Sequence, residues 1–268
     1  MSGWSFAPAP FVIAGPCVGE PGDVLPRVAE VLARYAQRRG VPVCFKASFD
    51  KANRSRLTGE RGPGAEEGLR LLDRVKRESG LPLLTDIHEA HQAAPAAEVV
   101  DALQVPAFLC RQTDLLVAAG RTGRPVNVKK GQWMSPEGMA GSVEKVRSGG
   151  SRDVAVTERG TFFGYGDLVV DMRNFARLRD AVAAPVIFDA THSVQRPGLG
   201  AGGTSAGERE HIPALLAAAA AAGADGFFLE THPDPARALS DAATQWPLER
   251  LPALLDRALD LWARVHGD

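Results

Sequence analysis

Short apolar runs alternate with longer stretches of mixed apolar and polar residues along the whole chain. The apolar runs predict eight buried strands, at Phe11–Ala14, Val43–Phe45, Pro82–Thr85, Val100–Val105, Val126–Val128, Val154–Thr157, Val186–Phe188 and Phe227–Leu229. In the longer stretches, apolar residues recur at the spacing of an amphipathic helix, which predicts helices near 24–39, 64–79, 91–98, 112–120, 136–147, 172–182, 208–222 and 248–265.

Eight strands, each followed by a helix, are the pattern of a (β/α)8 TIM barrel. The 268 residues are close to the length of such a barrel, about 250. No linker or break in composition divides the chain, so we expect one domain over residues 1–268. An open doubly wound sheet is the main alternative, and it is weakened because no Gly-x-Gly-x-x-Gly follows the first strand.

Polar side chains follow nearly every predicted strand at its carboxyl end. They are, in chain order, Cys17, Lys46, Asp86, His88, Gln104, Lys129, Lys130, Glu158, Arg159, Asp189, His192, Glu230 and His232. In a barrel these ends face one mouth, where catalysis occurs. Burying so many polar groups together costs stability unless they bind something, so we expect the active site there.

The segment Lys46–Ser55 places two lysines, an arginine, an asparagine and two serines directly after the second strand. Cations and hydroxyls at a strand end suit a phosphorylated small molecule. Lys129, Lys130 and Arg159 follow other strands, and with this segment they predict a substrate that carries phosphate and carboxylate. A solvated loop without function is the alternative.

A second set of residues has the chemistry of a metal site: Cys17, His192, Glu230 and Asp241. The first, seventh and eighth strands are neighbours in a closed barrel, so these side chains can converge. One thiolate, one imidazole and two carboxylates suit a divalent transition ion. A lone cysteine after a strand is also commonly a small buried hydrophobic residue, so the residues alone leave both readings open.

Two predicted loops are long, at 50–64 and 193–207, and the second is rich in glycine. Its composition indicates mobility, and we expect it to act as a lid that excludes water from bound substrate. A surface loop without function is the alternative.

Charge and cysteine content narrow the class of protein. The 31 basic and 32 acidic side chains nearly balance, which argues against a nucleic-acid partner. No run of about 18 apolar residues is present, and the first ten residues lack the pattern of a secretory signal, so we expect no membrane span. Three cysteines form no even disulfide framework, and together these features favour a cytoplasmic protein.

With these residues identified, the chain resembles the 3-deoxy-D-manno-octulosonate 8-phosphate synthase family along nearly its whole length. The matching segments are Ile13–Cys17, Phe45–Ser55, Arg61–Gly64, Pro106–Asp114, Asn127–Lys130, Glu158–Gly160, Phe163–Tyr165, Leu168–Asp171, Asp189–Gln195 and Glu230–Pro235. The resemblance implies a homotetrameric barrel that condenses phosphoenolpyruvate with D-arabinose 5-phosphate. The products are the eight-carbon sugar acid phosphate and inorganic phosphate, on the route to lipopolysaccharide.

The resemblance also implies roles for single residues. Those matching phosphoenolpyruvate-binding positions are Lys46, Lys51, Lys129, Arg159 and His192. Those matching the arabinose phosphate site are Asn53, Arg54 and Ser55, with Arg111 supplied by a neighbouring subunit. We add Ser48, Asp86 and Gln104, which lie at strand ends, to the substrate-binding set.

The family has metal-dependent and metal-independent branches, and the latter carry Asn where Cys17 stands. This chain has the cysteine and the segment Ser240–Gln245 of the metal-dependent branch. The resemblance therefore implies Zn²⁺, Fe²⁺, Mn²⁺, Co²⁺ or Cd²⁺ held by Cys17, His192, Glu230 and Asp241. Asp241, if a labile ligand, can also act as a base.

Three other functions compete with this reading. A synthase of 3-deoxy-D-arabino-heptulosonate 7-phosphate uses erythrose 4-phosphate, but that family typically has Lys-Pro-Arg-Thr where this chain has Lys51-Ala-Asn-Arg54. A class I aldolase would use Lys129 as a Schiff base. A barrel that binds sugar phosphates without catalysis is the alternative from another class.

Overall fold

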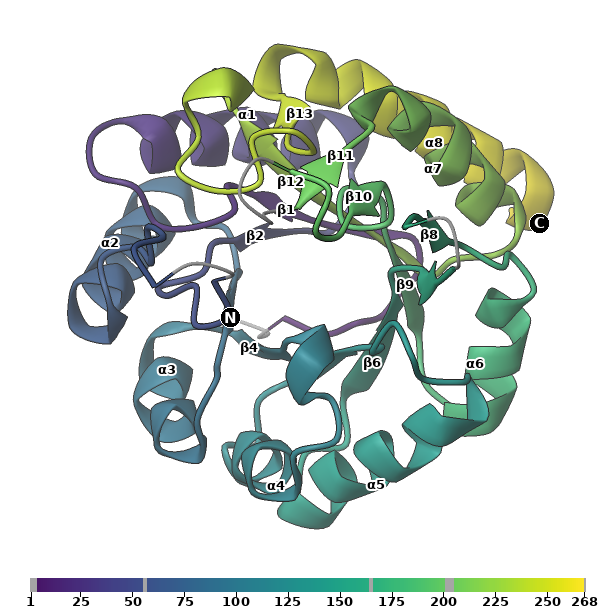
Figure 1. Ribbon diagram of the computed structural model, residues 1–268. Helices are drawn as coiled ribbons and strands as arrows, with labels where there is room; N and C mark the ends of the chain where they lie inside the picture. Colours follow the sequence, from purple (N-terminus) through teal and green to yellow (C-terminus); the bar gives the residue numbers. More distant parts are fainter. Residues whose placement is uncertain (1–3, 55–56, 164–165, 201–204, 268) are drawn as a thin grey trace.

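The computed structural model describes residues 4–54, 57–163, 166–200 and 205–267, and it confirms the predicted (β/α)8 barrel. Eight parallel strands form its wall: β1 (Phe11–Gly15), β2 (Val43–Lys46), β3 (Leu83–Asp86), β4 (Ala102–Val105), β5 (Val126–Lys129), β6 (Val154–Glu158), β9 (Val186–Asp189) and β12 (Gly226–His232). β1 pairs with both β2 and β12, which closes the ring seen in Figure 1.

In the described part of the chain, eight α-helices follow the strands, and they surround the barrel (Figure 1). They are α1 (Val24–Arg39), α2 (Ala65–Ser79), α3 (Ala93–Val99), α4 (Thr113–Arg121), α5 (Ala140–Gly149), α6 (Asn174–Val182), α7 (Ile212–Ala221) and α8 (Leu251–His266). Gly40 and Gly80 end the first two helices in the left-handed conformation, where glycine meets no steric penalty.

Several predicted helices begin earlier than the observed ones because short 3-10 turns precede them. These turns are η1 (Ala90–Gln92), η3 (Glu137–Met139), η5 (Arg209–His211) and η7 (Leu248–Arg250), and two more, η2 (Ala107–Leu109) and η6 (Pro235–Arg237), lie in loops. A tight turn repeats its apolar residues almost as a helix does, so the periodicity of the sequence does not separate the two.

Among the described residues, five two-residue strands were not predicted, because they are too short to show a period. β7 (Thr161–Phe162) pairs with β8 (Leu168–Val169), and β10 (Gln195–Arg196) pairs with β11 (Ala206–Gly207), both antiparallel. β13 (Trp246–Pro247) pairs parallel to the end of β12. All of them lie in the loops that follow β6, β9 and β12, so they shape the barrel mouth.

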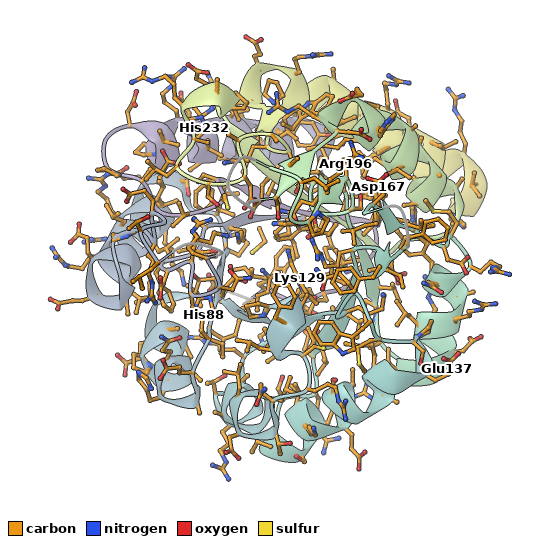
Figure 2. All side chains as sticks on the ribbon, viewed as in Figure 1. His88, Lys129, Glu137, Asp167, Arg196 and His232 are labelled. Atoms are coloured by element: carbon orange, nitrogen blue, oxygen red, sulfur yellow. The ribbon has the colours of Figure 1, made fainter. Side chains whose placement is uncertain are left out.

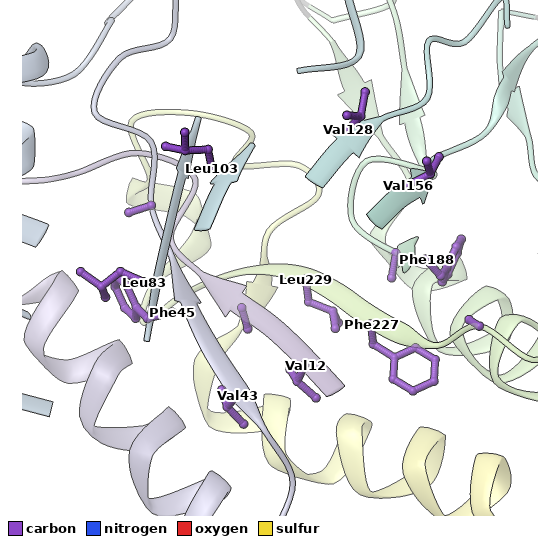
Figure 3. Packing of buried hydrophobic residues seen from close by; sticks show 14 of the residues in the cluster. Val12, Val43, Phe45, Leu83, Leu103, Val128, Val156, Phe188, Phe227 and Leu229 are labelled. Carbon is purple, nitrogen blue, oxygen red and sulfur yellow. The ribbon is translucent and has the colours of Figure 1, made fainter. Parts of the chain in front are cut away.

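The hydrophobic core has two parts, because strand residues alternate between the two faces of the wall. Val12, Phe45 and Leu229 point outward and pack with the helices (Figure 3). Phe11, Ile13 and other inward residues fill the lower barrel, where Phe6 and Trp4 join them. Polar side chains replace apolar ones higher in the interior. No helix in the described part of the chain is long and apolar enough to cross a membrane.

Candidate active site

A cavity of about 750 Å³ opens at the carboxyl ends of the strands. This volume lies in the range of small-molecule sites. The predicted site residues that line it are Lys46, Ser48, Lys51, Asn53, Arg54, Asp86, Gln104, Lys129, Arg159, His192, Glu230 and Asp241. Figure 2 shows Lys129 near the centre of the barrel mouth, with His88 to one side.

Lys46, the last residue of β2, is the most fully enclosed cation of the cavity. Its Nζ lies 2.8 Å from Oε1 of Glu230, 3.5 Å from Oδ2 of Asp86 and 3.0 Å from the carbonyl oxygen of Cys17. Burial lowers the pKa of Lys46, but the two carboxylates outweigh it and raise that pKa. Lys46 is therefore a permanent cation.

Lys129, at the end of β5, also lines the cavity. Its Nζ is 2.6 Å from Oδ2 of Asp189 and 3.7 Å from the centre of the Phe228 ring. Burial lowers the pKa of Lys129, and Asp189 only partly offsets this. Such an ammonium gains most when a further anion approaches it.

Two arginines and a third lysine complete the cationic lining. Arg159 donates to the carbonyl oxygen of His192 at 3.0 Å and to Oε1 of Gln195 at 2.7 Å. Arg54 donates to Oγ of Ser240 at 2.7 Å, and Lys51 Nζ lies 3.8 Å from Oε1 of Glu230. The lining thus presents cations on several sides, which suits a substrate with two anionic ends.

The predicted metal ligands gather on one side of the cavity. The ligand atoms of Cys17, Glu230 and Asp241 all lie within 4.8 Å of one another. His192 reaches this group through Nε2, which is 3.5 Å from Oε2 of Glu230, and its Nδ1 is held 2.7 Å from Oδ2 of Asp189. A carboxylate on Nδ1 is a common way to orient a metal-binding imidazole.

The donor set fits a divalent cation on physical grounds. Oε2 of Glu230 is buried and has no hydrogen-bond partner among the described residues, a state that costs free energy and that a cation relieves. Burial, Asp241 and Glu230 raise the pKa of the Cys17 thiol, so it keeps its proton and donates to Oδ2 of Asp241 at 2.9 Å. A cation in place of that proton would bind both the Cys17 sulfur and Oε2 of Glu230.

Asp241 is held in an unusual backbone conformation. Its φ is 51°, in the left-handed region, which aspartate tolerates better than most residues. Gln195 donates to Oδ1 of Asp241 at 2.8 Å, and the Gln245 amide donates to the carbonyl oxygen of Ser240 at 2.8 Å. Strain of this kind concentrates at functional sites.

The structure corrects the prediction for Lys130 and places Arg111 outside the cavity lining. Lys130 does not join the cationic lining: its fully buried Nζ lies 3.4 Å from Oε1 of Glu158 and 3.2 Å from Oγ1 of Thr161. This prediction was wrong because consecutive residues point to opposite sides of the wall. Arg111 is exposed and outside the cavity lining, and Ser55 lies outside the described residues.

Residues without a predicted role also line the cavity. Gln195 joins Arg159 to Asp241 through its side-chain amide, yet it stands six residues after β9, beyond the reach of the strand-end rule.

Gly198 and Gly200 of the predicted lid are in the cavity lining. In the same loop, Nε of Arg196 lies 2.9 Å from Oδ1 of Asp167, which belongs to the loop after β6 (Figure 2). Whether this loop closes over substrate stays a prediction.

The fold and the site define a (β/α)8 barrel whose mouth is lined by buried cations. The sequence model of the DAHP synthetase I family matches residues 8–260. The chain therefore belongs to the DAHP synthetase I family.

Individual relatives are similar over almost the full length. The 2-dehydro-3-deoxyphosphooctonate aldolase of Nitratidesulfovibrio vulgaris (strain DP4) is 55% identical over 256 residues, which cover 96% of this chain and 93% of the relative. The enzyme of that name from Syntrophobacter fumaroxidans is 55% identical over 251 residues, 94% of this chain and 86% of the relative. One from a Synechococcus species is 54% identical over 248 residues, 92% and 87%. These relatives confirm the resemblance of the sequence motifs to the 3-deoxy-D-manno-octulosonate 8-phosphate synthase family.

Proposed function

We propose that the protein condenses phosphoenolpyruvate with D-arabinose 5-phosphate and water to give 3-deoxy-D-manno-octulosonate 8-phosphate and inorganic phosphate. The observation that carries this proposal is the set of cations around one cavity, in a chain about half identical to relatives named for this sugar acid phosphate. Lys46 and Lys129 both line the cavity, and each is paired with a buried carboxylate.

The cations divide between the two substrates. Lys46, Lys51, Lys129 and Arg159 bind the phosphate and carboxylate of phosphoenolpyruvate, with Ser48, Asp86 and Gln104 beside them. Asn53, Arg54 and Ser55 bind the sugar phosphate, together with Arg111 of a neighbouring copy. Fixing both substrates brings C3 of phosphoenolpyruvate beside the sugar aldehyde, and well-oriented reactants of this kind lower a barrier by up to about 7–11 kcal/mol.

The site also supports the later steps. C3 of phosphoenolpyruvate bonds to the aldehyde carbon as the aldehyde oxygen becomes a hydroxyl, and a water adds to C2. Phosphate then leaves by cleavage of the C2–O bond as the C2 ketone forms. Of the two protons of the water, one goes to the aldehyde oxygen and the other leaves with phosphate. Lys129 and Arg159 stabilise the charge that develops on the departing phosphate, because they are fixed before the reaction begins. Asp241 accepts a proton from the water.

A divalent cation fits the donor set of this site. Cys17, His192, Glu230 and Asp241 would hold Zn²⁺, Fe²⁺, Mn²⁺, Co²⁺ or Cd²⁺, which supplies Lewis-acid chemistry to a bound oxygen. We further propose a single catalytic domain over residues 1–268, a cytoplasmic homotetramer, and a product used for lipopolysaccharide. The exposed position of Arg111 supports the tetramer, since a partner can reach it.

The second candidate is the heptulosonate phosphate synthase, which is favoured by the name of the family. The two candidate functions are distinguished by measuring phosphate release from phosphoenolpyruvate with arabinose 5-phosphate and, in parallel, with erythrose 4-phosphate. We expect arabinose 5-phosphate to give the higher kcat/KM. Faster turnover of the erythrose substrate would establish the second candidate, and no release with either would leave a barrel that binds without catalysis.

The class I aldolase is tested separately. The lowered pKa of Lys129 suits a Schiff base, but its Nζ is paired with Asp189 at 2.6 Å. We therefore expect no covalent adduct by mass spectrometry after borohydride treatment with both substrates.

A further inference from the structure

A line of buried polar side chains crosses the upper barrel interior from β6 to β2 and ends at the cation Lys46. Its members are Thr157, Asn127, Gln104, Asp86, Ser48 and Lys46, and all are 6% exposed or less. Oγ1 of Thr157 donates to Oδ1 of Asn127 at 2.7 Å, and Nδ2 of Asn127 donates to Oε1 of Gln104 at 2.8 Å. Nε2 of Gln104 then donates to Oδ1 of Asp86 at 2.6 Å.

These hydrogen bonds have one direction. Each side-chain amide has a donor end and an acceptor end, and both ends are used. The Thr157 hydroxyl donates to the acceptor end of Asn127, and the Asn127 NH2 donates to Gln104. The acceptor end of Gln104 is thereby occupied, so its NH2 faces Asp86. The carboxylate at the end of the line receives a donor.

Asp86 is the carboxylate that accepts the hydrogen bond from the Gln104 amide. Burial raises the pKa of Asp86, but Lys46, Lys51 and Lys129 outweigh it and hold that pKa well below its ordinary range. Oδ2 of Asp86 accepts from Ser48 and lies 3.5 Å from Nζ of Lys46. If the Gln104 amide were turned over, its carbonyl oxygen would face a carboxylate at hydrogen-bond distance, which is repulsive.

Asn127 and Thr157 stand behind the site. Of the described residues in the line, Gln104, Asp86, Ser48 and Lys46 are in the cavity lining, whereas Asn127 and Thr157 are not. We propose that Asn127 and Thr157 are positioning residues that hold the Gln104 amide in one orientation, so that Asp86 and Lys46 are set to receive phosphoenolpyruvate. This inference rests on the proposed function for the identity of the ligand.

The first test is Asn127→Asp, which keeps the shape of the side chain but removes its donor. When the introduced carboxyl is protonated, it can still donate to Gln104. When it is ionised, Gln104 turns toward it and presents its carbonyl oxygen to Asp86. Burial raises the pKa of this carboxyl, while Lys129, two residues along the strand, lowers it.

The expected result is a new dependence on pH. The ratio of variant to parent kcat/KM for phosphoenolpyruvate falls about tenfold as pH rises, the scale of one lost hydrogen bond to a charged group. A ratio that stays constant with pH would overturn the proposal. The matched control is Asn174→Asp, at a buried asparagine whose amide donates to Glu158 at 2.9 Å outside the cavity lining. It lowers thermal stability without a pH-dependent ratio.

A second pair of variants tests the proposal independently if Asn127→Asp fails to fold. Thr157→Val removes the hydroxyl that fixes Asn127, and Thr157→Ser retains it. We expect Thr157→Val to raise KM for phosphoenolpyruvate about fivefold, from one lost neutral hydrogen bond, with kcat within about twofold. Thr157→Ser returns KM to the parent value. Equal KM values for the two variants would contradict the proposal.

The outcome is separable from that of the proposed function. If the parent releases no phosphate with either sugar phosphate, the proposed condensation fails. The same variants are then compared by calorimetric binding of phosphoenolpyruvate alone, where the pH dependence and the serine rescue are expected in Kd. If the parent does not bind phosphoenolpyruvate either, both proposals fail.

Discussion

Glu230 gives one carboxylate oxygen to Lys46, at 2.8 Å, and turns the other toward Nε2 of His192, at 3.5 Å. A single buried carboxylate thus contacts Lys46, which we propose binds phosphoenolpyruvate, and also belongs to the candidate metal site. Because Lys46 and a metal ion compete for the charge of one group, filling the metal site leaves Lys46 with more positive charge for substrate. The two halves of the site are therefore coupled.

We expect removal of metal by a chelator to weaken phosphoenolpyruvate binding as well as to stop turnover. Cys17→Ala should bind Co²⁺ at least about tenfold more weakly, the scale expected when a site loses support for its metal. Metal content after dialysis and the thiolate-to-Co²⁺ absorption band measure this directly. Full activity of Cys17→Ala in chelator would eliminate the metal role, and Cys17→Asn tests whether asparagine supports turnover without metal.

Lys130 should act on stability and not on substrate. Lys130→Met leaves Glu158 buried without its cation, and breaking a buried pair in this way costs about 3–5 kcal/mol. Urea unfolding measures the loss, and KM for phosphoenolpyruvate should stay within about twofold of the parent. The double variant with Glu158→Gln should be more stable than Lys130→Met alone. A large rise in KM for phosphoenolpyruvate would show that Lys130 contributes to substrate binding.

Tyr35 should make the fold sensitive to alkali. Its hydroxyl on α1 donates to Oδ1 of Asp256 on α8 at 3.0 Å, and burial together with Asp256 raises the pKa of Tyr35. Below the ordinary tyrosine pKa of about 10, both folded and unfolded chains keep the proton, so this contribution is complete. At higher pH the unfolded chain loses its proton first, and the contribution decreases as pH rises toward the folded pKa.

The matching variant is Tyr35→Phe. At pH 8 it should lower the free energy of unfolding by about 1.5–3 kcal/mol, the value of a hydrogen bond to a charged group. The difference from the parent should shrink between pH 10 and 11, as followed by urea titrations at each pH. A difference that is independent of pH would show that folding does not raise the pKa of Tyr35.

Arg111 is best tested by mixing subunits. We expect Arg111→Ala and Lys129→Met each to be nearly inactive alone. In mixed tetramers, about a quarter of the sites combine an intact Lys129 with an intact Arg111 from a neighbour, so activity should return to that extent. Without any recovery after mixing, Arg111 would act within its own chain or not at all.

The sequence predicted the barrel and the cavity lining through one physical rule, that parallel strands end at one mouth. That rule found Lys46, Lys129, His192 and Glu230. It failed for Lys130, since the alternation of a strand places neighbours on opposite faces. It could not find Asn127, whose partner Gln104 is 23 positions away and becomes a neighbour only when β4 and β5 pair.

The closure of β1 on β12 has a consequence for synthesis of the chain. Cys17 follows the first strand and Asp241 follows the last, so the two meet only after nearly the entire polypeptide has left the ribosome. A chain that ends before β12 lacks the second partner of β1 and cannot assemble the group that contains Cys17, Glu230 and Asp241. A truncated chain without Asp241 therefore carries an incomplete donor set, and the candidate metal site forms only when the ring closes.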